Sequence, residues 1–391
     1  MCQVWHVLAK KWPKWNSLTD TQRLIQGSAR QFSKNQLAPN AARFEAQKQV
    51  PKEILAQMAE LGLMSMGVKE TYGGTDAGAL AFSLALREIA YGCASTAVMM
   101  AVTNMVAEVI QYFGSEVQRE QHLPSFGSGH YRTAAFALSE ASAGSDPAAM
   151  LSTAQKHHDR WLISGSKQWI SNAASAGVFV LWARTSEQGN KGLSCFLLPA
   201  GTPGLSLGKP EDKMGLRASD TLPLELDGCE LPLDALLGQE GQGFKIAMHA
   251  LNGGRISIAS QCLGIARAAF DEAKAYAKER EQFSQAIANF QAVQWMLADC
   301  QTELDAMELL VNHAAARKEQ GIDYSQAASM AKLYASEAAW RICNRALQIH
   351  GGYGYTREYP VERHLRDVRA TQIYEGSSEI QRIVIGRSLL S

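Results

Sequence analysis

The sequence lacks the cysteine pairs that mark zinc sites and disulfide frameworks. Its seven cysteines are scattered, odd in number and form no C-x-x-C pair. Scattered cysteines are typical of small core residues in a reduced compartment. His157 and His158 adjoin in a predicted hairpin, where neighbouring side chains point to opposite faces of a strand. We therefore expect no metal site.

The sequence also has no excess of either charge, with 38 basic and 38 acidic residues. This balance argues against nucleic acid or an anionic membrane as the main partner. No apolar run is expected to reach the length of a membrane span. Residues 1–16 lack a continuous apolar segment and a cleavage site, so they are expected to be an irregular extension. The expected location is the cytoplasm of a bacterium, or the mitochondrial matrix if the source is eukaryotic.

Three common catalytic and nucleotide-binding motifs are absent. No G-x-G-x-x-G follows a predicted strand, and no G-x-x-x-x-G-K-[ST] occurs. Rossmann-type and P-loop nucleotide binding are therefore not supported. A G-x-S-x-G nucleophile elbow is missing as well.

The chain contains three segments of different character. Residues 17–130 have helical apolar spacing, and residues 131–236 have short β-branched and aromatic runs between glycines and prolines. Helical spacing returns over residues 237–391, where apolar residues form a heptad seam. We predict an α+β multidomain fold with a helical domain, an antiparallel β-barrel or sandwich and a four-helix bundle. The seam consists of Val293, Leu297, Cys300, Leu304, Met307, Val311 and Ala314.

Glu375 is the strongest catalytic candidate. It lies in the apolar, glycine-flanked run Q-I-Y-E-G-S-S-E-I, about twenty residues after H-G-G-Y-G-Y. Burial disfavours the charged form of a carboxylate and raises its pKa, which suits abstraction of a weakly acidic proton. Taken alone, Glu375 also fits a loop residue before a helix that starts at G-S-S-E.

Four further segments accompany Glu375 in a specific order. They are F-A-L-S-E-A-S-A-G-S-D (136–146), G-S-K-Q-W-I-S-N-A (165–173), D-K-M-G-L-R-A-S-D-T (212–221) and R-E-Q-F (280–283). Small and hydroxyl residues in the first leave room for a planar ring, and the second supplies an aromatic wall. The last follows a helix that we expect to begin near Arg255.

With these segments the chain strongly resembles the acyl-CoA dehydrogenase family over about residues 18–390. The resemblance implies the helical, β and helical domains, and FAD bound without a Rossmann fold between the β domain and the bundle. It also implies a homotetramer, an acyl-CoA substrate and an electron-transferring flavoprotein as electron acceptor.

The resemblance also assigns the cofactor-binding residues. Two segments are expected at the flavin ring, with Leu138 and Ser139 closest, and others reach the FAD of a neighbouring subunit or its adenosine side. The ring segments supply Phe136, Leu138, Ser139, Gly144, Ser145, Trp169, Ile170 and Ser171. The remaining contacts are Arg280, Gln282, Phe283, Phe290, Gln291, Gln348, Ile349, Gly351, Gly352, Ser377 and Glu379.

Glu375 matches the catalytic base of the family. Some members place the base instead just before an arginine that matches Arg255, and here that position is Gly254, which has no side chain. The resemblance further implies substrate contacts from Ser145, Asn252, Gly253, Gly254, Arg255 and Arg387.

The form N-G-G-R-I-S-I-A-S most resembles the isobutyryl-CoA dehydrogenases within the family. We therefore expect FAD-dependent α,β-dehydrogenation of a short branched acyl-CoA, with hydride transfer to flavin N5. A short straight-chain or 2-methylbutyryl thioester, and an oxygen-using acyl-CoA oxidase of the same fold, remain alternatives. A non-catalytic protein of this fold would take up no FAD.

Overall fold

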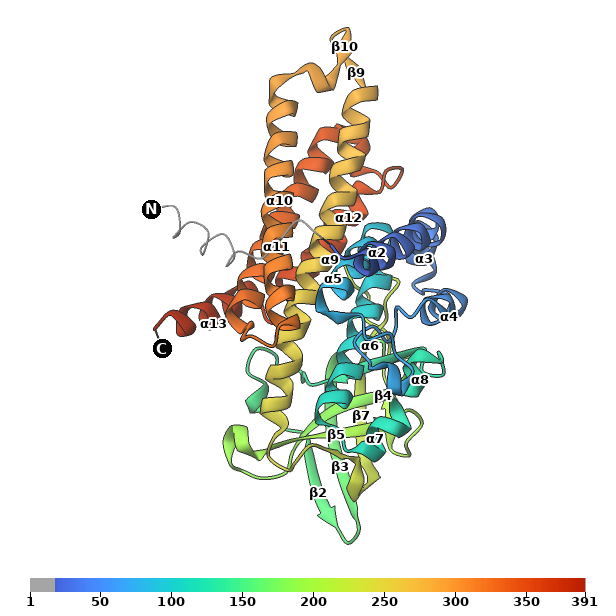
Figure 1. Ribbon diagram of the computed structural model, residues 1–391, viewed down its shortest axis with the longest axis vertical. Helices are drawn as coiled ribbons and strands as arrows, with labels where there is room; N and C mark the ends of the chain where they lie inside the picture. Colours follow the sequence, from blue (N-terminus) through green and yellow to red (C-terminus); the bar gives the residue numbers. More distant parts are fainter. Residues whose placement is uncertain (1–17, 391) are drawn as a thin grey trace.

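The computed structural model describes residues 18–390, and the predicted extension over residues 1–16 lies outside them. Helices come first, a β-sheet follows, and long helices complete the chain (Figure 1), which confirms the predicted architecture. The N-terminal helices are α2 (Asp20–Phe32), α3 (Ala41–Gln47), α4 (Lys52–Glu60), α5 (Gly78–Gly92), α6 (Ala94–Phe113), α7 (Glu116–His122) and α8 (Pro124–Gly127).

Helix α6 corrects one expectation from the sequence. Within residues 18–390 it is the one helix that is long and apolar enough to cross a membrane, by length and composition alone. Its apolar window is 72% buried inside the protein, as in the core helix of a folded domain. The prediction that no apolar run reaches this length was therefore wrong, and most residues of both α5 and α6 are buried.

The middle region forms one sheet in the order β6-β7-β3-β2-β4-β5-β8, and β1 pairs with β4. Most pairs are antiparallel, as predicted, but β1 runs parallel to β4, and β2 meets β4 in one parallel pair. The sheet is therefore mixed rather than wholly antiparallel. Its strands are β1 (Thr133–Ala137), β2 (Thr153–His157), β3 (Arg160–Ser171), β4 (Ala176–Arg184), β5 (Leu193–Pro199), β6 (Leu205–Leu207), β7 (Thr221–Pro232) and β8 (Leu236–Leu237).

The hairpin between β2 and β3 places its histidines differently from the prediction. His158 occupies the turn with a φ of 56°, so its ring meets that of His157 edge to face, with centroids 4.4 Å apart. Within the described part of the chain, no group of three or more His, Cys, Asp or Glu residues could hold a metal ion. The described cysteines are free and buried, as expected of core residues: Cys93, Cys195, Cys229, Cys262, Cys300 and Cys343.

Helix α9 (Gly243–Glu279) lies at the centre and contacts α5, α6, α10, α11 and α12. It begins at Gly243 and not near Arg255, so the glycines before Arg255 lie inside the helix. The predicted seam is confirmed on α10, where Val293 and Leu297 are partly buried and the other seam residues are buried: Cys300, Leu304, Met307, Val311 and Ala314. The remaining elements are β9 (Glu281–Gln282), β10 (Gln285–Ala286), α10 (Gln291–Glu319), α11 (Ser325–His350), α12 (Val361–Arg369) and α13 (Ser378–Leu390).

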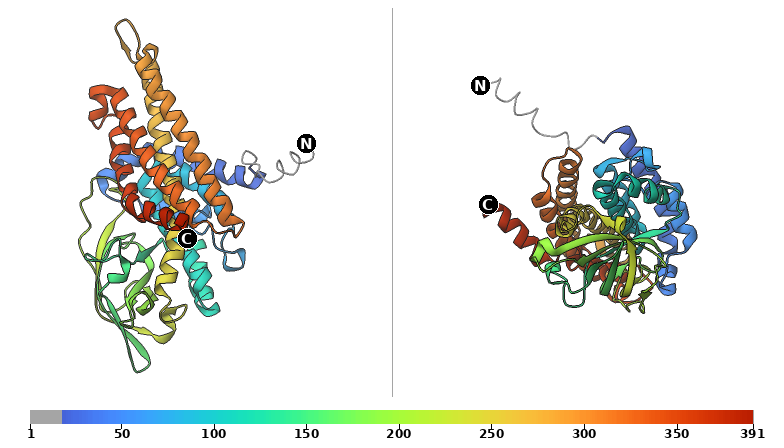
Figure 2. Two further views of the ribbon diagram at one scale, coloured as in Figure 1. Left: turned by 90° about the vertical axis from the view of Figure 1, so that its left-hand side faces the viewer. Right: turned by 90° about the horizontal axis from the view of Figure 1, so that it is seen from below.

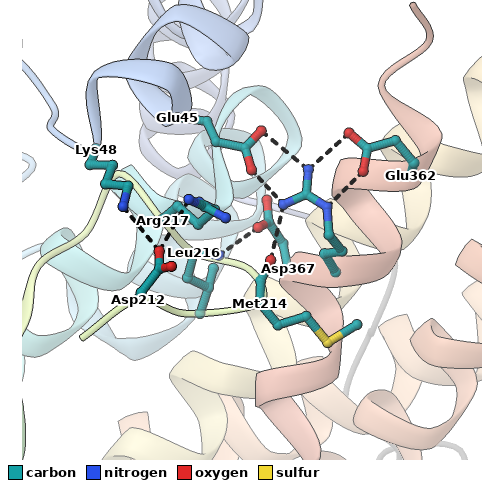
Figure 3. Close-up of polar contacts among 9 residues, drawn as sticks. Glu45, Lys48, Asp212, Met214, Leu216, Arg217, Glu362 and Asp367 are labelled. Carbon is teal, nitrogen blue, oxygen red and sulfur yellow. Dashed lines mark hydrogen bonds and ion pairs between the residues drawn. The ribbon is translucent and has the colours of Figure 1, made fainter. Parts of the chain in front are cut away.

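The three regions are joined by an ionic cluster at α12 (Figure 3). The Arg366 guanidinium pairs with Glu45 on α3 and donates to the Met214 carbonyl at 3.0 Å. Beside it, the Asp367 carboxylate accepts a 2.6 Å hydrogen bond from the backbone N–H of Leu216. Residues 212–221, one of the four segments that accompany Glu375, therefore connect the β-sheet to both helical regions.

Candidate active site

Glu375 lies in the short loop between α12 and α13. Its φ is 55° and that of Gly376 is 88°, so two consecutive residues adopt the left-handed conformation. This conformation is uncommon for a residue with a side chain and requires support from its surroundings. The Lys332 ammonium donates to the Gly376 carbonyl at 2.6 Å, and the Gln381 amide donates to the carbonyls of Glu375 and Gly376 at 3.1 and 2.9 Å. Contacts from α11 and α13 thus hold the loop.

The surroundings of the Glu375 carboxylate favour its protonated form. Its Oε2 atom is buried and has no hydrogen-bond partner among the described residues. Burial raises the pKa of Glu375 to about 7, while the nearby cations of Arg255 and Lys332 act in the opposite direction. A carboxylate with a pKa near neutrality is suited to act as a general base.

Gly254 lies directly against this carboxylate. A Cβ atom added at Gly254 would lie 2.5 Å from Glu375 Oε2 and 3.3 Å from Met105 Sδ. Any larger residue at this position would therefore displace the carboxylate. The absence of a side chain at Gly254, which the sequence analysis used to exclude an alternative base, also makes room for Glu375.

Arg255 is buried one residue further along α9. Its Nη1 atom donates to Asn252 at 2.6 Å and to the Ser329 hydroxyl at 3.3 Å, while its Nε atom has no partner among the described residues. For two other predicted substrate contacts, no described hydrogen bond or ion pair links the side chain to this cluster. Ser145 is exposed in the loop after β1, and Arg387 is exposed near the end of α13.

A cavity of about 620 Å³ is lined in part by Gly254. Its wall comes from the loop before α5, from α5 and α6, and from the middle of α9 and the end of α10. Gly254 and Met105 line it, but Glu375 does not. The cavity therefore adjoins the carboxylate without including it.

The two segments predicted at the flavin ring meet in the β-sheet region. The backbone N–H of Gln168 donates to the Ser139 carbonyl at 2.9 Å, and Lys167 donates to Glu140 at 2.7 Å. Trp169 follows with a φ of 65° and a side chain that is 59% exposed. Ser139 and Ser171 are half-buried, whereas Ile170 is buried.

The other residues predicted at the flavin ring range from buried in the core to exposed at the surface. The ring of Phe136 packs against Trp182 with centroids 4.4 Å apart, at the edge of the core. Gly144 is exposed, like the neighbouring Ser145. Leu138 is buried, and its carbonyl accepts a 3.4 Å hydrogen bond from Lys167.

The second predicted set lies around the far end of α9. A cavity of about 470 Å³ is lined by Arg280, Gln282, Ile349, Gly351 and Gly352, among others. Figure 1 places this end, with β9 and β10, opposite the end of the molecule that carries β2. One chain therefore does not bring the two sets of predicted FAD contacts together.

Further members of this set lie at the same end, except Ser377 and Glu379, which lie near Glu375. Phe283 has a φ of 52°, is 89% exposed and lies 6.0 Å from the Phe290 ring. Gln348 belongs to α11 rather than to a loop, and both Gln348 and Gln291 are exposed. Near Glu375, the Ser377 hydroxyl accepts from the backbone N–H of Ile380 at 3.4 Å, and Glu379 is exposed on the first turn of α13.

The residues present fit a flavin nucleotide. A planar ring can stack on an exposed indole, hydroxyls can donate to its polar edge, and an arginine can bind a pyrophosphate in a charge-assisted way. Trp169, Ser139 and Ser171 provide the first two features, and Arg280 provides the third. Figures 1 and 2 show α13 beginning where the C-terminal helices meet the sheet, on the side away from the N-terminal helices.

Comparisons with known proteins identify the class. The N-terminal, middle and C-terminal domains of acyl-CoA dehydrogenases match residues 19–130, 135–229 and 241–390. The chain belongs to the acyl-CoA dehydrogenase family. It is a flavin-dependent oxidoreductase that binds FAD, which confirms the predicted enzyme class and cofactor.

Individual relatives and solved structures are similar to this chain over nearly its whole length. The chain is 46% identical over 375 residues to the mitochondrial short-chain specific acyl-CoA dehydrogenase of Bos taurus, covering 95% of this chain and 91% of the relative. The butyryl-CoA dehydrogenase structure of Megasphaera elsdenii is 39% identical, with a TM-score of 0.94 over 96% and 99% of the two chains. A structure described with the electron transferring flavoprotein of Acidaminococcus fermentans is 41% identical, with the same TM-score and coverage.

Lys332 and Gln381 contact the Glu375 loop but were not predicted from the sequence. Lys332 lies 44 residues before its acceptor Gly376, and nothing in its local spacing indicates this contact. Gln381 lies five residues after Gly376, on the first turns of α13. Its closeness to the predicted helix start was the one available signal.

Proposed function

We propose that this protein dehydrogenates a short-chain acyl-CoA thioester between its α and β carbons and yields the 2,3-enoyl-CoA. The observation that supports this best is the Glu375 carboxylate, which has a buried, unpartnered oxygen beside Gly254. Glu375 takes the α proton in this proposal. Bound FAD supplies the acceptor for the hydride that leaves the β carbon.

The loop has two features that assist proton abstraction. An α proton next to a thioester is too weakly acidic for an ordinary carboxylate in water, and the raised pKa of Glu375 reduces this mismatch. The backbone N–H of Glu375 has no acceptor among the described hydrogen bonds. It is free to donate to the thioester oxygen as negative charge develops there.

The identity of the acyl group is the finer part of the proposal. Relatives named for short-chain or butyryl thioesters favour a short acyl chain. The N-G-G-R pattern on α9 favours the branched isobutyryl group. The two acyl groups have the same number of carbons. Even a difference of one methylene between two substrates changes the discrimination by only about 1–3 kcal/mol. We therefore propose a short-chain substrate with isobutyryl-CoA as the preferred thioester, and butyryl-CoA as its competitor.

The assembly proposed is a homotetramer in which neighbouring subunits share each FAD. The separation of the two FAD-contact sets within one chain supports sharing. Ser139 and Ser171 would hold the flavin ring, and Arg280 and Gln282 would bind the pyrophosphate in the neighbouring subunit. Reduced flavin would pass electrons to an electron-transferring flavoprotein, as the similarity to the Acidaminococcus structure suggests.

The test is an anaerobic titration of the purified, FAD-containing protein with butyryl-, isobutyryl-, 2-methylbutyryl- and octanoyl-CoA, added separately. We expect the flavin band to bleach fastest with isobutyryl-CoA and slowest with octanoyl-CoA. Faster bleaching by butyryl-CoA would replace the branched substrate with the straight one. A band that no thioester bleaches would contradict the proposed function, and rapid reoxidation in air would indicate an oxidase.

A further inference from the structure

Lys332 is the one lysine that donates to the Glu375 loop in the described part of the chain. It lies on α11, its side chain has no solvent exposure, and its Nζ atom donates to the Gly376 carbonyl at 2.6 Å. Burial is costly for an ammonium group unless it is paired or hydrogen-bonded. None of the cofactor or substrate contacts proposed above requires this residue.

We propose that Lys332 is a positioning residue for the catalytic base. Its ammonium fixes the carbonyl of Gly376, the residue next to Glu375, and so places a positive charge near the Glu375 carboxylate, which keeps the base anionic for proton abstraction. This inference rests on the proposed function, because it assigns a role to Lys332 only if Glu375 is the base.

The charge of Lys332 is separable from its hydrogen bond. The neutral amide of Gln381 also donates to the Gly376 carbonyl, so a second side chain, which carries no charge, fixes the same carbonyl. If holding the carbonyl were the whole role, a neutral donor would serve at both places. Only Lys332 adds a positive charge at this carbonyl, and we assign that charge to the neighbouring base.

The other charged and titratable groups near the pair lie on α9 and α11, with Tyr374 in the loop itself and Glu379 on α13. Arg255 on α9 also acts on Glu375, and its guanidinium is held by the neutral side chains of Asn252 and Ser329, so the two cations act on the base together. Cys262 on α9 and Glu337 on α11 act on Lys332, and burial lowers the pKa of Lys332 to about 8. Glu337 is occupied by hydrogen bonds from residues on either side of Glu375: Gln372 and Ser378.

Two variants separate charge from hydrogen bonding. Lys332→Gln keeps a donor for the Gly376 carbonyl and removes the charge. Gln381→Met removes two neutral hydrogen bonds and keeps the charge. For both variants and the wild type we would measure FAD content and the rate of anaerobic flavin reduction by butyryl-CoA from pH 5.5 to 9.

We expect Lys332→Gln to retain FAD and to move the acid midpoint of the reduction rate upward by about one pH unit, because an opposite charge nearby lowers a carboxyl pKa by about that much or more. At pH 6.5 its rate should fall several-fold and should recover at high pH. Gln381→Met should keep the wild-type midpoint. Lys332→Arg, which keeps the charge, should keep a midpoint close to the wild-type value.

An unchanged midpoint in Lys332→Gln would overturn the proposal, as would an equal shift in Gln381→Met, because loop geometry rather than charge would then explain it. If Lys332→Gln does not retain FAD, the comparison of Lys332→Arg with Lys332→Met decides, since a structural role alone predicts equal loss in both. Failure of the proposed function is distinguished by the wild type, whose flavin would then not be reduced at any pH.

Discussion

The Glu375 loop and the end of α9 around Arg280 differ in how fully the chain surrounds them. The loop is held by Lys332 and Gln381 of the same chain, and a carboxylate oxygen is buried in it. At the far end of α9, by contrast, Phe283 is 89% exposed beside an open cavity. Within one chain, the carboxylate oxygen of the proposed base is thus enclosed, whereas the residues of the proposed pyrophosphate site are largely exposed.

Of the changes that test this contrast, replacing the proposed base should have the largest effect on turnover. Glu375→Gln keeps the size of the side chain but removes the proton acceptor. General base catalysis contributes about 10²–10⁴-fold, so turnover should fall by about 10³-fold or more. The visible flavin band should remain, because the substitution preserves the size of the side chain and Glu375 is not one of the predicted FAD contacts. Turnover close to the wild-type value would refute Glu375 as the base.

A matched pair of glycine variants tests the close approach to Glu375. In Gly254→Ala the new methyl group would lie 2.5 Å from the carboxylate, whereas in Gly253→Ala it would meet the flexible end of Lys318 at 2.9 Å. A small misplacement of a catalytic group can cost about 10²-fold, so only Gly254→Ala should lose activity on that scale. Steady-state rates of both variants, with FAD content as the check on folding, give the comparison. Equal losses would show that the carboxylate is not constrained by Gly254.

Arg280→Gln tests the exposed end of α9 and its proposed contact with the pyrophosphate of FAD. Charge-assisted hydrogen bonds are worth about 1.5–3 kcal/mol, so FAD affinity should fall by about 10- to 100-fold. Arg23→Gln is the control, since Arg23 forms only a surface pair with Asp20 at 3.6 Å. Fluorescence titration of the apoprotein with FAD measures both. Unchanged affinity in Arg280→Gln would remove Arg280 from the FAD site.

A change of one pH unit gives the smallest of these effects. The pKa of Glu375 is raised to about 7, and only the deprotonated carboxylate can accept the α proton. The rate of flavin reduction should therefore decrease as the pH falls through 7, by about tenfold per unit well below it. A rate that is constant from pH 7 to pH 5 would contradict the raised pKa.

The sequence predicted those features that depend on local pattern. Helical spacing and short apolar strands indicated the order of the three regions, and Gly254 beside Arg255 excluded the alternative base. The start of α9 was misplaced because two glycines interrupt its apolar pattern, although packing against five helices keeps it continuous. The contact of Lys332 with Gly376 depends on how α11 is placed in space, which no local pattern specifies.

The most direct test of the account compares anaerobic flavin reduction by butyryl-CoA carrying hydrogen or deuterium at the α carbon. If Glu375 removes the α proton in the step that reduces the flavin, the band should bleach with both thioesters, and more slowly with deuterium. Glu375→Gln should bleach with neither on the same timescale. Bleaching at one rate with both thioesters, and at that same rate in Glu375→Gln, would contradict the role assigned to Glu375.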